Sequence, residues 1–118
     1  MKVILSTESP IAALRLRNEI VKQVSEQTTN HILTWSYLKS ADGYDILYHD
    51  AEQFVSYPER NVLFRIQLDG ANLYFSTAWW KNNPRPSEDM FCLHVGRLVE
   101  MLLTHFRAFF GKLNIIDY

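Results

Sequence analysis

Residues 62–80 consist of two alternating apolar runs that meet at the dipeptide Asp69-Gly70, and this stretch constrains the fold more than any other. Successive side chains of a strand point to opposite faces, and Asp-Gly is a strong hairpin turn signal. The apolar face of the predicted hairpin consists of Val62, Phe64, Ile66, Leu68, Leu73, Phe75, Thr77 and Trp79. Two registers fit the turn: one pairs Ile66 with Leu73, and the other pairs Leu68 with Leu73. They differ by an even number of residues, so both bury the same face.

A second hairpin is predicted from residues 32–39 and 44–49, with Asp42-Gly43 at the turn. If that turn has two residues, the better core face consists of Leu33, Trp35, Tyr37, Ile46 and Tyr48. His49 then shares the opposite face with Leu47. Sequential hairpins usually lie side by side, so we expect four antiparallel strands, with residues 2–6 as a candidate fifth. Residues 113–118 are expected to form a last short strand or an extended cover.

Helices are predicted on both sides of these hairpins. Ser9-Pro10 begins the first, with serine as N-cap and proline at the first helical position, and it should run to about residue 25. Arg17 falls in its apolar sector, so its guanidinium must reach the surface or a buried acceptor. Ser87 begins the second, longer helix, which is expected to end at Gly111.

The element order predicts an α+β fold. We expect a four- to five-stranded antiparallel sheet with an N-terminal helix and a long C-terminal helix packed mainly on one face. The chain has 118 residues and 47% hydrophobic residues, which fits a single globular domain spanning residues 1–118.

Charge and local composition argue against several classes of protein. The formal net charge is −1, so any electrostatic recognition must be local. The N-terminal apolar run has three residues, too few for a signal-peptide core or a membrane span, and Cys92 is the single cysteine. We therefore expect a cytoplasmic protein, with Cys92 buried or half-buried and inert.

The sequence contains no nucleophile, phosphate-binding or metal-ligand motif, so we predict no catalytic, cofactor or metal site and no enzyme activity. The four histidines, His31, His49, His94 and His105, lack the spacing of metal ligands. His94 is expected near the solvent side of its helix, and His105 at the edge of the core. The densest polar cluster is His49, Asp50 and Glu52, and it supports an alternative: a small ligand-binding or enzymatic domain.

The best surface candidate is the group Arg65, Tyr74, Trp80, Lys81 and Arg85. If Trp79 faces the core, Trp80 stands on the other face, beside Tyr74 and near Arg65. Exposed aromatic residues with arginine are typical of protein-binding hot spots. We therefore expect a small non-enzymatic protein that binds another protein, such as an inhibitor, antitoxin or immunity-type protein that neutralises a bacterial toxin.

Two other readings stay open. A helix or a second copy of the chain in a homodimer would cover Trp80 equally well. Single-stranded nucleic acid is the alternative ligand for the same surface together with Arg60, but interleaved acidic residues and the near-neutral net charge disfavour it.

Overall fold

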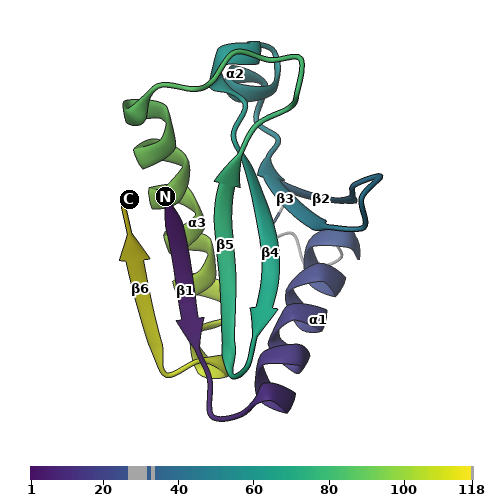
Figure 1. Cartoon of the computed structure of the whole chain (residues 1–118), viewed down its shortest axis with the longest axis vertical. Coiled ribbons are helices and arrows are strands. Elements are labelled where there is room, and N and C mark those ends of the chain that lie inside the picture. The colour runs from purple at the N-terminus through teal and green to yellow at the C-terminus, as the bar shows by residue number, and fades with distance from the viewer. Residues whose placement is uncertain (27–31, 33, 118) are drawn as a thin grey trace.

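The computed structural model describes residues 1–26, 32 and 34–117 (Figure 1). Its strands are β1 (Lys2–Ser6), β2 (Trp35–Lys39), β3 (Asp45–His49), β4 (Leu63–Asp69), β5 (Asn72–Ala78) and β6 (Lys112–Ile116). Its helices are α1 (Pro10–Glu26), the single turn α2 (Glu52–Val55) and α3 (Glu88–His105), with short 3-10 turns at Pro58–Arg60 and Arg107–Phe109.

The strands form one antiparallel sheet of six strands in the order β2-β3-β4-β5-β1-β6. The α+β class and the side-by-side hairpins are confirmed, and β1 is the fifth strand. The predicted number of four to five strands was too low. The chain after α3 pairs with the remaining edge of β1 from Ser6↔Lys112 to Lys2↔Ile116 and so adds β6.

The β4–β5 hairpin adopts the register in which Leu68 pairs with Leu73 and Asp69 with Asn72. The predicted inner face is buried at Val62, Phe64, Ile66, Leu73 and Phe75. Leu68 and Trp79 also belong to the predicted inner face but are not buried, since they are 38% and 37% exposed. Both lie at ends of the hairpin: Leu68 precedes the turn, and Trp79 follows Ala78, the last residue of β5.

The predicted register of the β2–β3 hairpin was wrong by one residue. Trp35 pairs with His49 and Lys39 with Asp45, and the next backbone contact, Ser40 N to Tyr44 O at 2.9 Å, leaves a three-residue turn at residues 41–43. Gly43 takes a left-handed conformation, with φ +86°, as this kind of turn requires. The extra turn residue rotates β3, so Leu47 and His49 face inward with Trp35, whereas Tyr48 faces outward. The prediction for Leu33 lies outside the described residues.

Both long helices pack on the inner face of the sheet, as expected. Leu16 and Ile20 of α1 and Leu98 and Leu102 of α3 belong to the same core cluster as Phe64 and the other inward side chains. Serine caps the start of each helix: Ser9 Oγ accepts from Ala12 N at 3.1 Å, and Ser87 Oγ accepts from Met90 N at 3.2 Å.

Arg17 on α1 is only partly buried and reaches a buried acceptor on the sheet. Its Nη1 lies 3.4 Å from Oδ2 of Asp45, a carboxylate that also accepts a hydrogen bond from the hydroxyl of Tyr37. Burial first, and then the bond to Asp45, raise the pKa of Tyr37 to about 12. This inward Asp45 is therefore paired and hydrogen-bonded, which is what makes its burial tolerable.

Helix α3 ends at His105, six residues before the predicted end at Gly111. Phe106 leaves helical geometry, with φ −126° and ψ 10°, and the chain makes the 107–109 turn before it enters β6. Among the described residues, none of the helices combines the length and apolar character needed to cross a membrane.

Candidate functional site

The outer face of the sheet, opposite α1 and α3, carries most of the predicted binding residues. We call it the open face, because in the described part of the chain no helix packs over its central strands (Figure 1). Its larger side chains are Lys2, Ile4, Leu38, Ile46, Tyr48, Leu63, Arg65, Gln67, Asp69, Tyr74, Lys112 and Ile116, of which Ile46 and Leu63 are buried.

Arg65 and Tyr74 lie on neighbouring strands of this face, since Arg65 pairs with Ser76 and Gln67 with Tyr74. Each takes part in a cation–π contact. The Arg65 guanidinium lies 5.0 Å from the ring centre of Tyr44, and the ammonium of Lys2 lies 5.0 Å from that of Tyr74. Basic groups and aromatic rings are therefore interleaved across the centre of the sheet.

Trp80, Lys81 and Arg85 lie in the connection between β5 and α3, beyond the end of the strand, and all three are exposed. Arg85 associates with Trp79 rather than Trp80: its guanidinium is 5.7 Å from the Trp79 ring and 3.1 Å from Oε1 of Glu88. Because β5 ends at Ala78, strand alternation does not fix the directions of Trp79 and Trp80. The structure thus brings Arg65 and Tyr74 together and leaves the other three residues on a separate loop.

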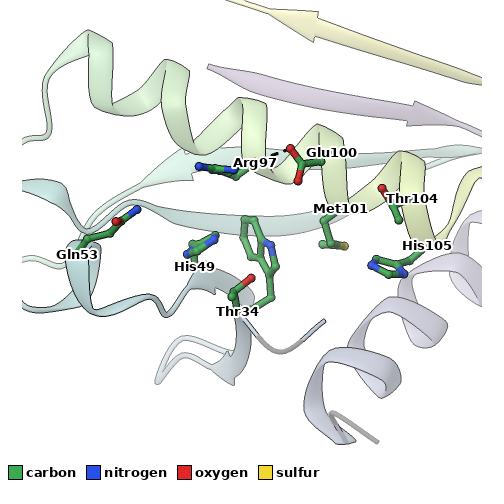
Figure 2. A pocket seen from close by; sticks show the side chains of 9 residues that line it. Thr34, His49, Gln53, Arg97, Glu100, Met101, Thr104 and His105 are labelled. Carbon is green, nitrogen blue, oxygen red and sulfur yellow. Dashed lines mark ion pairs between the residues drawn. The ribbon is translucent and has the colours of Figure 1, made fainter. Parts of the chain in front are cut away.

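A second candidate site surrounds His49, whose inward position follows from the three-residue turn. A cavity of about 360 Å³ lies between α3, α2 and the inner side of the β2–β3 hairpin (Figure 2). We call it the His49 groove. Its lining residues are Thr34, Trp35, His49, Gln53, Arg97, Glu100, Met101, Thr104 and His105. Gln53, His49 and Arg97 lie at one end of it, and Thr104 and His105 lie at the other (Figure 2).

The His49 ring is held by aromatic neighbours on several sides. Ring centres lie 5.3 Å away for Trp35, 5.0 Å for Phe54 and 6.5 Å for His94, all in edge-to-face arrangements. The backbone N–H of Ala51 donates to His49 Nδ1 at 3.3 Å. Burial, more than any neighbouring charge, lowers the pKa of His49. The ring is therefore neutral at pH 7, and its proton is on Nε2.

His94 lies next to the His49 ring, on the side of the core. The prediction that His94 lies near the solvent side of its helix was wrong. The side chain is fully buried, and its Nε2 donates to the carbonyl oxygen of Arg60 at 2.9 Å. Its Nδ1 has no hydrogen-bond partner among the described residues. Burial lowers the pKa of His94 to about 4. The error arose because His94 contacts Phe54 of α2, an element for which the sequence shows no clear period.

The predicted His49, Asp50 and Glu52 cluster does not converge. Asp50 accepts a hydrogen bond from the Ser36 hydroxyl, on the outward side of β2, and Glu52 is exposed on α2 outside the His49 groove. Within residues 1–26, 32 and 34–117, no cluster of three or more His, Cys, Asp or Glu side chains is arranged to hold a metal ion. His31 lies outside the described residues.

Two further expectations concern α3. Cys92 is exposed, not buried, because it falls on the outward side of the helix. His105 is half-buried at the edge of the core, as predicted. The sequence reasoning missed Arg97, Glu100 and Thr104, although their spacing of three and four residues places them on one helical face. Polar residues at this spacing are typical of a solvent-exposed helix face, and nothing in the pattern shows that the β2–β3 hairpin lies across from it.

No protein-family model, curated protein or solved structure matches this chain. The geometry of the open face and of the His49 groove therefore carries the functional argument by itself.

Proposed function

We propose that this protein is a non-enzymatic binding protein that recognises an acidic surface of another protein through the open face of its sheet. The observation that carries the proposal is the interleaving of Arg65 and Lys2 with Tyr44 and Tyr74 on a face that no described helix covers. Arginine and tyrosine are enriched at the energetic centres of protein interfaces. An inhibitor, antitoxin or immunity-type protein is the role we favour.

The charge distribution indicates the chemistry of the partner. Lys2, Arg65 and Lys112 are the basic strand residues on the open face, and Asp69, next to the turn, is the acidic one; Asp50, directly after β3, also lies on this side. The whole chain has a net charge of −1, so this positive patch is local. A complementary acidic patch would speed the encounter and fix the orientation of the complex.

Nucleic acid is a weaker candidate for the same face. Single-stranded nucleic acid binds by stacking its bases on aromatic rings that are free to accept them. Here one side of the Tyr44 ring is already occupied by Arg65, and one side of the Tyr74 ring by Lys2. A base that stacks on that side of either ring would have to displace the cation, whereas an acidic side chain can approach the cation from outside.

The test is affinity capture from the native host, followed by titration of the captured protein against purified variants. We expect Arg65→Glu to weaken binding by at least about 10-fold, since reversing a charge at an interface centre removes one contact and adds a repulsion. Tyr74→Ala should weaken it less. Adding oligonucleotide to the wild type should leave the NMR signals of the Tyr44 and Tyr74 rings unchanged.

Arg15→Glu is the matched control, because Arg15 is an exposed arginine on α1. It makes the same change in net charge away from the open face and should leave the affinity unchanged. If Arg65→Glu and Tyr74→Ala both bind like the wild type while Trp80→Ala or Arg85→Ala loses binding, the 79–86 connection is the interface and the open face is not.

A further inference from the structure

We propose that the His49 groove is a separate binding site for a small organic anion, whose carboxylate or phosphate oxygens accept hydrogen bonds from His49 and Arg97. The groove is on the helix side of the sheet, whereas the open face is on the other side, so the two proposals are independent.

His49 can serve as a fixed donor. Ala51 N–H occupies its Nδ1, so the neutral ring must present Nε2–H, and within the described chain no acceptor is bonded to that nitrogen. The side chain is 8% exposed, and Trp35, Phe54 and His94 fix the plane of its ring. A rigid, oriented donor at the wall of a cavity costs little conformational entropy when a ligand binds.

Arg97 supplies the charge at the same end of the groove. In Figure 2 Arg97 and Gln53 lie at the same end of the groove as His49, and the Arg97 charge acts on the His49 ring. A guanidinium is suited to carboxylate and phosphate because it can donate two parallel hydrogen bonds to their oxygens. The hydroxyls of Thr34 and Thr104 also line the cavity and add donors that suit an oxygen-rich ligand.

Glu100 is the one carboxylate among the described lining residues, and its negative charge opposes the binding of an anion. Its Oε2 lies 4.0 Å from Arg97 Nη1, and both side chains are well exposed, so the pair is weak. An incoming anion would replace Glu100 as the partner of Arg97. Glu100 therefore lowers the affinity, and its removal distinguishes an anionic ligand from a cationic one, for which Glu100 would be the anchor.

The size of the groove limits the ligand. A volume of about 360 Å³ is at the lower end of the range for small-molecule sites. Trp35 and Met101, which are 3% and 5% exposed, form an almost closed apolar floor. The site therefore suits a compact molecule with one anionic group rather than a polymer.

The test is titration of the protein with two simple probes, inorganic phosphate and acetate, followed by NMR of the His49 imidazole and the Trp35 indole. We expect saturable shifts with at least one probe, and the better probe identifies the preferred anionic group. Arg97→Gln should weaken binding at least about 10-fold, and Glu100→Gln should strengthen it several-fold. Arg15→Gln is the control for a general effect of charge and should bind like the wild type.

The pKa of His49, measured with and without a bound anion, gives a second readout. The groups that act on His49 are Asp50, Arg97, Glu100 and the neutral His94, with His105 at the far end of the groove. A bound anion adds negative charge next to Nε2, so the pKa of His49 should rise on binding. The proposal is overturned if neither probe gives saturable shifts, if Arg97→Gln binds as tightly as Arg15→Gln, or if Glu100→Gln weakens binding.

Discussion

The β2–β3 and β4–β5 hairpins both turn at an Asp-Gly dipeptide, but the glycine has a different place in each turn. In β4–β5, Asp69 pairs with Asn72, so Gly70 is the first of two turn residues, with φ +59°. In β2–β3, Lys39 pairs with Asp45, and Gly43 is the last residue of the three-residue turn, with φ +86°. The same dipeptide thus fixes two different registers.

The number of turn residues, even or odd, decides which side chains of each hairpin face the core and which face outward. The β4–β5 turn leaves Phe64 and Phe75 in the core and Arg65 and Tyr74 on the open face. With a turn of two residues in β2–β3, Tyr48 would face the helices and His49 would join the open face. The additional turn residue sends His49 inward instead, and the His49 groove exists for that reason.

The largest effect on the free energy of unfolding should come from the side chains of β3. A change in the β2–β3 register would move them between the buried face and the open face of the sheet. Leu47 is fully buried, so Leu47→Ala should lower the free energy of unfolding by about 2–5 kcal/mol. Tyr48 is half-buried on the open face, so Tyr48→Ala should cost about 1 kcal/mol. Urea unfolding at pH 7 measures both. A larger loss for Tyr48→Ala than for Leu47→Ala would indicate the two-residue turn.

The second-largest effect is the dependence of stability on pH that His94 causes. The pKa of His94 falls from 6.5 to about 4 in the folded state, so unfolding takes up a proton below pH 6.5. Its contribution to stability is complete above pH 6.5 and is lost as the pH falls toward 4. The loss is about 3 kcal/mol. Unfolding curves at pH 7 and pH 4 should show this extra loss in the wild type relative to His94→Gln.

The glutamine in that variant can still donate to the Arg60 carbonyl but does not titrate. All other ionisable groups are common to both proteins, so the difference between the two pH dependences isolates His94. Equal pH dependences would mean that His94 is accessible to water.

Much of the fold follows from local signals, whereas the His49 groove does not. Alternation and Asp-Gly were sufficient for β4–β5, and the serine caps were sufficient for the starts of α1 and α3, because these signals act within a few residues. The strand β6 was uncertain because it is stabilised only by pairing with β1, at the other end of the chain. Short apolar segments of this kind acquire their structure from distant partners.

The groove depends on two facts that no local pattern contains. One is the turn length at Gly43, since Asp-Gly is compatible with two or three turn residues. The other is which face of α3 lies opposite His49. Arg97 and Glu100 look like an ordinary solvent-exposed pair in the sequence, and only the packing of α3 across the sheet brings them to His49, which precedes them by 48 and 51 residues.

The smallest effect on stability should come from replacing the turn glycines, Gly43 and Gly70, by alanine. An alanine fits the left-handed region best near φ +57°, so Gly70→Ala should cost about 1 kcal/mol, and Gly43→Ala somewhat more. Beyond the glycine and its two chain neighbours, no heavy atom of the described residues lies within 4 Å of the added Cβ at either site, so the loss is conformational. A slip of β3 to a two-residue turn would relieve the strain in Gly43→Ala, but it would bury Tyr48 and expose His49. NMR titration of His49 detects such a slip. If inward packing outweighs the strain in the turn, the pKa of His49 in Gly43→Ala should stay below its usual value. If the strand slips, the pKa should return to about 6.5.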